Sequence, residues 1–154
     1  MKIGIDYHGV ITENPRFFAR FTKAAIDKGI EIFVISGGLK KDVEAYLKEH
    51  NILYIGIFAL LDYFKAKNMV TFYEDGSFFV ANDVWNRAKA NYCRQNGIDV
   101  HIDDSMLYGA YFQTPFCLYS GKKEECTMIK HQISVDFNQP AEKVLEDLLQ
   151  ALSV

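Results

Sequence analysis

The fold of this chain is decided by residues 2–12, KIGIDYHGVIT. The segment begins as a short apolar strand and ends in the polar residues Asp6, Tyr7 and His8, which Gly9 follows. In a doubly wound parallel sheet, ligands bind outside the carboxyl ends of the strands. An acid at this position also suits an ordinary turn, because Asp is one of the residues that turns favour. The choice between the two depends on whether other polar residues reach the same edge of the sheet.

The chain beyond this segment alternates between helix and strand patterns. Residues 14–29 predict a helix with Asn14 as its N-cap and Pro15 at its first position. The helix expected at 82–97 begins with Asn82 or Asp83 as its cap. Further helices are expected at 39–50 and 140–152, and further strands at 31–36, 52–58, 99–105, 115–120 and 131–137. Successive βα units with short connections predict an α/β fold, with a doubly wound, mainly parallel sheet flanked by helices.

Residues 69–81, MVTFYEDGSFFVA, interrupt this alternation. Two β-rich runs flank Asp75-Gly76, a pattern that predicts a small β-hairpin. The hairpin can be a purely structural edge element or a flap over a ligand site. Because the sequence holds no repeat, low-complexity tract or flexible linker, we expect one domain over residues 1–154.

The composition narrows the class of partner. A net charge of −3 gives no electrostatic reason to expect sequence-independent binding to nucleic acids. The three cysteines are widely spaced and form no CxxC pair, which fits reduced thiols better than a disulfide or zinc framework. No apolar run approaches the roughly 20 residues that a membrane span needs. We therefore expect a cytoplasmic protein without a membrane partner.

Polar residues end three of the predicted strands. Asp6 and His8 follow the first strand, Ser36 precedes two glycines after the second, and Asp103 with Asp104 ends a later one. Converging carboxylates repel one another unless one is protonated, so they usually hold a cation. An all-oxygen site with few carboxylates suits Mg²⁺. Because a carboxylate can also attack phosphorus and form an acyl phosphate, these residues suit phosphoryl transfer.

Two further features can hold a phosphate group. The hydroxyl of Ser36 and the backbone N–H groups of Gly37-Gly38 can donate to phosphate oxygens. The cation of Lys89 can neutralise charge shared between a nucleophile and the phosphoryl group. Each feature has a simpler alternative, because Ser36 can belong to a plain turn and Lys89 to the solvated face of its helix. Residues 103–105 can likewise form a helix N-cap.

Four ordered segments, GIDYHGVIT, FVISGG, NRAKANYC and VHIDDS, resemble the motifs of the haloacid dehalogenase (HAD) superfamily of phosphohydrolases. The resemblance extends from Lys2 to Ser105, and its specificity comes from the set of four. It implies a Rossmann-like core, dependence on Mg²⁺ and an aspartyl-phosphate intermediate. The intervals between the motifs leave no room for a separate cap domain, so the chain resembles capless or minimally capped members.

The same resemblance implies a role for each matching residue. Asp6 is expected to be the catalytic nucleophile and a Mg²⁺ ligand. Ser36, beside Gly37, is expected to bind the substrate phosphate, and Lys89 to steady both nucleophile and phosphate. The remaining implied Mg²⁺ ligands are Asp103, Asp104 and the main-chain carbonyl of His8.

His8 departs from the family pattern, because phosphatases of this family usually carry a second Asp two residues after the nucleophile. An imidazole gains and loses a proton near neutral pH, so His8 can protonate a leaving oxygen and then activate water. We therefore expect a Mg²⁺-dependent phosphomonoester hydrolase with His8 as general acid and base. Its substrate would be a phosphorylated small molecule or macromolecular end. The alternatives are a phosphotransferase and a catalytically degenerate module that binds a phospholigand or acts as a scaffold.

Residues that the motifs do not use are expected to be structural. His50, His101 and His131 share no metal-ligand spacing, so we expect them in the core or on the surface rather than at a metal. Cys93 falls on the face of a predicted helix and is expected to be a core thiol rather than a nucleophile.

Overall fold

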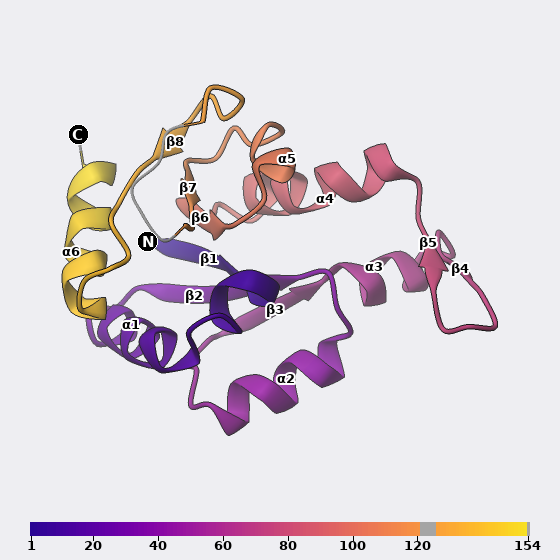
Figure 1. The fold of residues 1–154 in the computed structure, drawn as a ribbon, viewed down its shortest axis with the longest axis horizontal. Coiled ribbons are helices and arrows are strands. Elements are labelled where there is room, and N and C mark those ends of the chain that lie inside the picture. Colours follow the sequence, from indigo (N-terminus) through magenta and orange to yellow (C-terminus); the bar gives the residue numbers. More distant parts are fainter. Residues whose placement is uncertain (121–125, 154) are drawn as a thin grey trace.

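The chain folds around a parallel sheet with helices on both of its faces (Figure 1). In the computed structural model, which describes residues 1–120 and 126–153, six strands have the order β3-β2-β1-β6-β7-β8, and every neighbouring pair runs parallel. The strands are β1 (Lys2–Asp6), β2 (Glu31–Ser36), β3 (Gly56–Ala59), β6 (Val100–Asp103), β7 (Phe116–Leu118) and β8 (Gln132–Ile133). Since the order runs outward from β1 in both directions, the predicted doubly wound α/β fold is confirmed.

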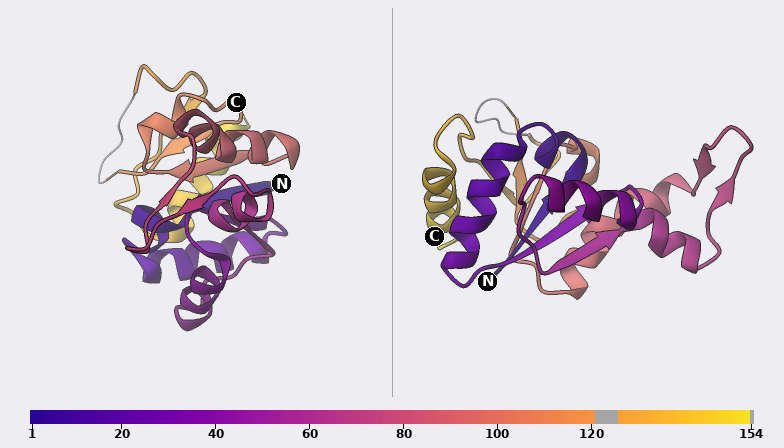
Figure 2. Two further views of the ribbon diagram at one scale, coloured as in Figure 1. Left: turned by 90° about the vertical axis from the view of Figure 1, so that its right-hand side faces the viewer. Right: turned by 90° about the horizontal axis from the view of Figure 1, so that it is seen from below.

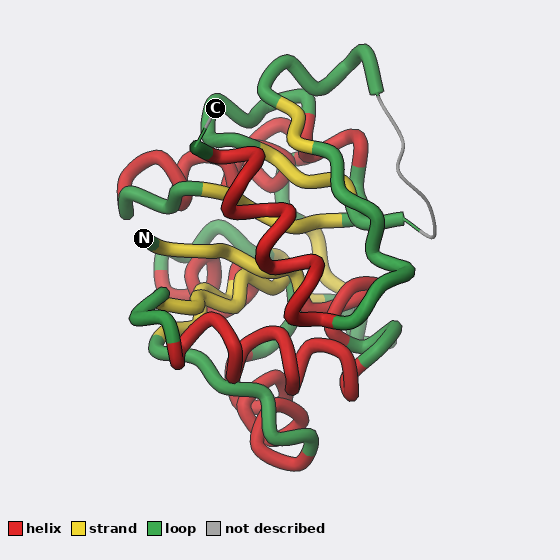
Figure 3. The backbone as a smooth tube through the Cα atoms, turned by 90° about the vertical axis from the view of Figure 1, so that its left-hand side faces the viewer, coloured by secondary structure: helices red, strands yellow, loops and turns green. Residues whose placement is uncertain are grey.

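The helices divide between the two faces of the sheet. They are α1 (Pro15–Asp27), α2 (Lys40–Glu49), α3 (Leu60–Ala66), α4 (Asn82–Gln95), the short α5 (Met106–Gly109) and α6 (Ala141–Leu152). Apolar residues of α1, α2 and α6 share one hydrophobic core with the central strands, while those of α3 and α4 share a second core. Figure 3 shows helices packed in front of the strands on the side of α1 and α6.

Alternation along the central strands decides which side chains meet α4. Ile3 and Ile5 of β1 belong to the core beneath α1 and α6. Gly4 faces the other way and is paired with His101 of β6. Because side chains in a strand repeat every two residues, Asp6 follows Gly4 and Asp103 follows His101 onto the α4 face.

Most predicted helix signals are confirmed, and one is wrong. The side chain of Asn14 accepts a hydrogen bond from the Phe17 N–H at 3.2 Å, and Pro15 is the first residue of α1. By contrast, α4 begins with Asn82, and its N-cap is Ala81, which makes no side-chain capping bond. Because Asn82 is already helical, neither it nor Asp83 occupies the extended position from which a side chain caps a helix.

The third strand begins later than the sequence pattern predicts. Ile52 closes the end of α2 instead, because its N–H donates to the Leu47 carbonyl at 2.9 Å after Asn51 adopts a φ of 57°. Pairing with β2 therefore starts at Gly56 rather than at residue 52. The strands β7 and β8 are also shorter than expected.

The predicted hairpin is present and extends away from the sheet (Figure 2). Its strands, β4 (Thr71–Phe72) and β5 (Phe78–Phe79), pair antiparallel and form a separate two-stranded sheet. Gly76 has a φ of 85° in the connecting turn. Among residues 1–120 and 126–153, no helix combines the length and apolarity needed to cross a membrane.

Candidate active site

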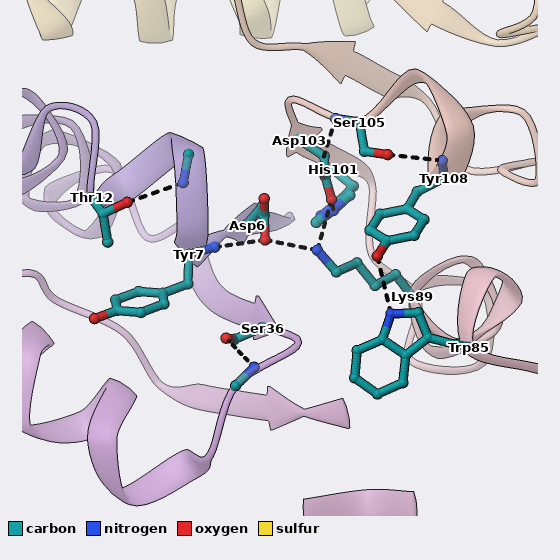
Figure 4. A network of polar contacts seen from close by, with 12 residues as sticks. Asp6, Tyr7, Thr12, Ser36, Trp85, Lys89, His101, Asp103, Ser105 and Tyr108 are labelled. Carbon is teal, nitrogen blue, oxygen red and sulfur yellow. Dashed lines mark hydrogen bonds and ion pairs between the residues drawn. The ribbon is translucent and has the colours of Figure 1, made fainter. Parts of the chain in front are cut away.

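Three parallel strands deliver polar side chains to one edge of the sheet, as the sequence predicts. Asp6 is the last residue of β1, Ser36 of β2 and Asp103 of β6. Asp104 follows Asp103, and Lys89 reaches the same region from α4 (Figure 4). The arrangement corresponds to the ligand crevice of a doubly wound sheet.

Lys89 joins the two central strands through a buried ion-pair network. Its Nζ lies 2.7 Å from Asp6 Oδ1 and 2.9 Å from Asp103 Oδ2. The exposed fractions of Lys89, Asp6 and Asp103 are only 3%, 5% and 0%. The solvated helix face considered for Lys89 is therefore wrong, since burying an ammonium group requires paired charges of this kind.

The chain leaves β1 through a turn that needs glycine. His8 (φ −69°, ψ 128°) and Gly9 (φ 78°, ψ −3°) have the angles of a type II turn, whose third residue favours Gly. The Tyr7 N–H donates to Asp6 Oδ1 at 2.8 Å, and the Gly9 N–H donates to Thr12 Oγ1 at 3.0 Å. A Cβ at Gly9 would collide with the carboxylate of Asp104, so the missing side chain also makes room for that acid.

Three carboxylates converge beside this turn. Asp6, Asp103 and Asp104 each offer an oxygen atom, and these atoms lie within 4.8 Å of one another. Hard oxygen ligands at this spacing fit Mg²⁺, which binds proteins through few carboxylates and keeps several waters. Since Lys89 provides one positive charge against three acids, a divalent cation would also relieve the remaining repulsion.

The pKa values of the three carboxyl groups are shifted in different directions. Burial is the main cause that raises the pKa of Asp6 from 3.8 to about 8, and the nearby Asp103 adds to it against the attraction of Lys89. Burial and Asp103 also raise the pKa of Asp104. Burial acts to raise the pKa of Asp103 as well, but Lys89 and the His101 hydrogen bond hold it below its usual range. Without a metal, Asp6 therefore holds a proton more readily than Asp103.

The turn after β2 lies next to the carboxylate cluster. Ser36 is fully buried, and its Oγ accepts a hydrogen bond from the Gly38 N–H at 3.0 Å. Gly37 packs against the Trp85 ring, since a Cβ at Gly37 would lie 3.1 Å from Trp85 Cζ2. Ser36 thus forms the plain turn that the sequence allowed, and its hydroxyl hydrogen remains able to donate to a ligand.

His8 belongs to the turn after β1, and its ring lies beside the turn after β2. Its side chain is exposed, and its ring packs edge-on against Tyr7 with the centroids 4.7 Å apart. A Cβ at Gly38 would lie 3.6 Å from His8 Nε2, so the imidazole stands over the Ser36–Gly38 turn. The structure therefore groups Asp6, Lys89, Asp103 and Asp104 in one cluster, with His8, Ser36 and Gly37 at the adjoining turn.

The fold has relatives among solved structures, although no protein-family model and no curated protein matches the chain. It is similar to 3-deoxy-D-manno-octulosonate 8-phosphate phosphatase from Moraxella catarrhalis, solved with magnesium, phosphate and KDO (15% identity, TM-score 0.50, 97% of this chain and 86% of that chain). A second similar structure, from Legionella pneumophila, is described as a HAD superfamily (subfamily III A) hydrolase (9% identity, TM-score 0.50, 99% and 83%). The chain has a HAD-like α/β core. At these identities the likeness concerns the fold alone.

Within this HAD-like core, His101 lies buried, which agrees with the expected structural position, but its contact with Asp103 was not predicted. The side chain is fully buried, and its Nε2 lies 2.9 Å from Asp103 Oδ2. Burial lowers the pKa of His101 against the opposing effect of Asp103, so the ring is neutral at pH 7. The available signal was the spacing of two residues between His101 and Asp103, which places both side chains on one face of a strand.

Two aromatic residues beside Lys89 were also missed. The Tyr108 ring of α5 lies 5.0 Å from Lys89 Nζ, and the Trp85 Nε1–H donates to the Tyr108 hydroxyl at 3.0 Å. Trp85 precedes Lys89 by one helical turn, which was the signal for a shared face. The predicted N-cap at 103–105 is real, because Ser105 caps α5 by accepting from the Tyr108 N–H at 3.2 Å.

Cys93 lies where the sequence predicts. It is fully buried in the second core, and burial raises the pKa of its thiol far above the usual range. A thiol that stays protonated is a poor nucleophile, so Cys93 is part of the packing rather than of the chemistry.

Proposed function

We propose that this chain is a Mg²⁺-dependent phosphomonoester hydrolase that works through a phosphorylated Asp6. The observation that carries the proposal is the Lys89 ammonium, which pairs with Asp6 at 2.7 Å and with Asp103 at 2.9 Å at the carboxyl edge of a HAD-like sheet. A structural ion pair needs one acid, whereas this cluster holds three. Such a surplus of acid around one ammonium group suits a site for a cation and an anionic substrate.

Asp6 is the proposed nucleophile. Its Oδ1 accepts hydrogen bonds from Lys89 Nζ and from the Tyr7 N–H, so the carboxylate is held in one orientation. With both lone pairs of Oδ1 engaged, we assign the attack on phosphorus to Oδ2. Lys89 then neutralises charge that the phosphoryl group shares with Asp6 during transfer.

Asp6, Asp103, Asp104 and the main-chain carbonyl of His8 would hold the Mg²⁺. When bound, the ion supplies a Lewis acid that polarises the phosphoryl group and an electrostatic reason for Asp6 to ionise. Ser36 and the backbone N–H of Gly37 would donate to the phosphate oxygens from the adjoining turn. The placement of the Asp6, Asp103, Asp104 and Ser36 side chains supports these roles, and substituting each side chain tests its role.

His8 is the proposed general acid and base. In the first step, an oxygen of Asp6 forms a bond to phosphorus while the ester oxygen leaves and takes a proton from the His8 imidazolium. In the second step, neutral His8 takes a proton from a water molecule, which attacks phosphorus and releases inorganic phosphate and free Asp6. The exposed position of His8 beside the Ser36–Gly38 turn leaves its ring accessible to a substrate oxygen and to water.

The proposed substrate is a phosphorylated small molecule or macromolecular end, acted on by a single domain of residues 1–154. The Moraxella structure of the same fold holds magnesium, phosphate and KDO, which supports a test with magnesium and phosphate esters. The hairpin β4–β5 extends near Trp85, whose ring lies 5.6 Å from that of Phe78. A flap role for the hairpin is therefore part of the proposal.

The deciding experiment measures hydrolysis of an aryl phosphate with and without Mg²⁺, in the native chain and in Asp6→Asn. Turnover that needs Mg²⁺ and disappears in Asp6→Asn is expected, and full activity of the variant would refute the nucleophile. His8 in place of a second acid favours one competing function, a module that binds phospholigands. That module would bind Mg²⁺ and a phosphate mimic without turnover, whereas a phosphotransferase would turn over only with an added acceptor alcohol.

A further inference from the structure

We infer that His101 is a positioning residue that orients the Asp103 carboxylate for the cation. The inference rests on the proposed Mg²⁺ site and adds a residue that does not touch the cation itself. Residues behind a metal ligand fix its direction by hydrogen bonding and contribute to metal affinity.

Three donors hold Asp103. His101 Nε2 and Lys89 Nζ each lie 2.9 Å from Oδ2, and the Ser105 N–H lies 3.0 Å from Oδ1. The donors come from β6, from α4 and from the residue that caps α5, so they approach the carboxylate from separate directions (Figure 4). A carboxylate bound in this way cannot rotate without losing a hydrogen bond. Its remaining lone pair on Oδ1 therefore keeps a fixed direction.

The His101 ring is itself held in place. It stacks on Phe112 with the centroids 5.1 Å apart and the planes 3° from parallel, and Phe116 contacts its edge. On its other side, the strand β1 has Gly4, where a Cβ would lie only 2.9 Å from His101 Nδ1. The absence of a side chain at Gly4 thus leaves room for the imidazole.

Packing alone does not explain a histidine at this position. Because Asp103 Oδ2 can only accept, Nε2 is the donor in this hydrogen bond. The other nitrogen, Nδ1, is buried against the Gly4 backbone, and within the described chain no partner meets it with good hydrogen-bond geometry. Burying a polar atom without a partner costs roughly 1–3 kcal/mol, which a phenylalanine in the same space would avoid. The hydrogen bond from Nε2 to Asp103 explains why this residue is a histidine.

The test compares variants that separate the hydrogen bond from the packing. His101→Phe keeps a ring against Phe112 and removes the donor, whereas His101→Gln can restore a donor at the position of Nε2. Phe112→Leu is the matched control, because it weakens the stacking and leaves the hydrogen bond. Mg²⁺ binding is measured for all of them by titration calorimetry, which does not depend on turnover, and folding is checked by urea denaturation.

His101→Phe should weaken Mg²⁺ binding by roughly 10–100-fold while folding normally. His101→Gln should recover most of that loss, and Phe112→Leu should lower stability with Mg²⁺ affinity close to that of the native chain. Native affinity in His101→Phe, or no recovery in His101→Gln, would overturn the inference and leave the metal site standing. No Mg²⁺ binding in the native chain would overturn the proposed function together with the inference.

A second measurement does not need any variant to fold. In ¹⁵N spectra of the native chain, the His101 ring should carry its proton on Nε2, and its signals should move when Mg²⁺ is added. A proton on Nδ1 alone, with none on Nε2, would contradict the hydrogen bond to Asp103 and refute the inference.

Discussion

Replacing Asp6 with Asn should make the metal-free protein more stable. Asp6 is only 5% exposed and lies beside two further acids, and burial raises its pKa from 3.8 to about 8. Asn has the shape of the protonated acid and can still accept from the Tyr7 N–H and Lys89. The variant therefore removes the cost of placing an ionisable group in this position.

The magnitude follows from the pKa values. Since the folded-state pKa is raised, the contribution of Asp6 to stability is fully present below pH 3.8 and is lost as the pH rises toward 8. One pKa unit corresponds to about 1.4 kcal/mol, so roughly three units between 3.8 and pH 7 set an upper value of about 4 kcal/mol. Because Asp6 shares Lys89 with Asp103, we expect a gain of about 2–4 kcal/mol at pH 7.

The assay is urea denaturation in the presence of a chelator between pH 4 and pH 8. The difference between Asp6→Asn and the native chain should be small at pH 4 and grow with pH. Asp27→Asn serves as the control, because Asp27 pairs with Lys23 at an exposed site where ion pairs contribute little. Parallel curves for the native chain and Asp6→Asn would refute the reasoning. Saturating Mg²⁺ should reduce the difference in the free energy of unfolding, because it stabilises the native chain far more than the variant.

Three other substitutions test the remaining parts of the site. Lys89→Met should lower the free energy of unfolding by roughly 3–5 kcal/mol at neutral pH, because it leaves the ionised, fully buried Asp103 without its cation; an effect no larger than that of the exposed Lys143→Met would contradict the ion-pair network. His8→Ala should slow hydrolysis mainly for substrates with poor leaving groups, as shown by comparing aryl and alkyl phosphates; equal losses on both would argue against an acid. Gly9→Ala should cost about 1–3 kcal/mol and raise the Mg²⁺ concentration needed for half-saturation, because its Cβ meets Asp104. Gly29→Ala has a similar φ of 77° and open space around it, so it should share the backbone cost and leave Mg²⁺ binding unchanged.

The parts of the fold that were predictable depend on local patterns. Apolar runs that end in Asp6, Ser36 and Asp103 identified the strands and the edge where they meet, because parallel strands bring their carboxyl ends together. The cap at Asn14 and the hairpin turn at Gly76 were readable from residue type alone. Each of these signals is complete within a few residues.

The parts that were missed depend on partners distant in sequence. The apolar run at 52–58 looked uniform, yet Ile52 closes α2 and only Gly56 and its successors reach β2. His101 appeared to be an unremarkable core residue, because nothing local shows that Asp103 needs a donor beside Lys89. The His8 ring lies near Gly38, thirty residues away, and this neighbour could not be identified from the motif that contains His8.

The position of β1 at the centre of the sheet has a consequence for how the protein is made. During synthesis, β1 emerges before the other strands of the sheet and can pair with β2 early, but its other edge stays unpaired until β6, which starts at Val100. Until then, a ribosome-bound chain displays an apolar strand with an unpaired edge, the kind of surface that chaperones cover and that aggregation exploits. The last strand to reach β1 also carries Asp103, so the nascent chain acquires its full set of acids only when the middle of the sheet can close.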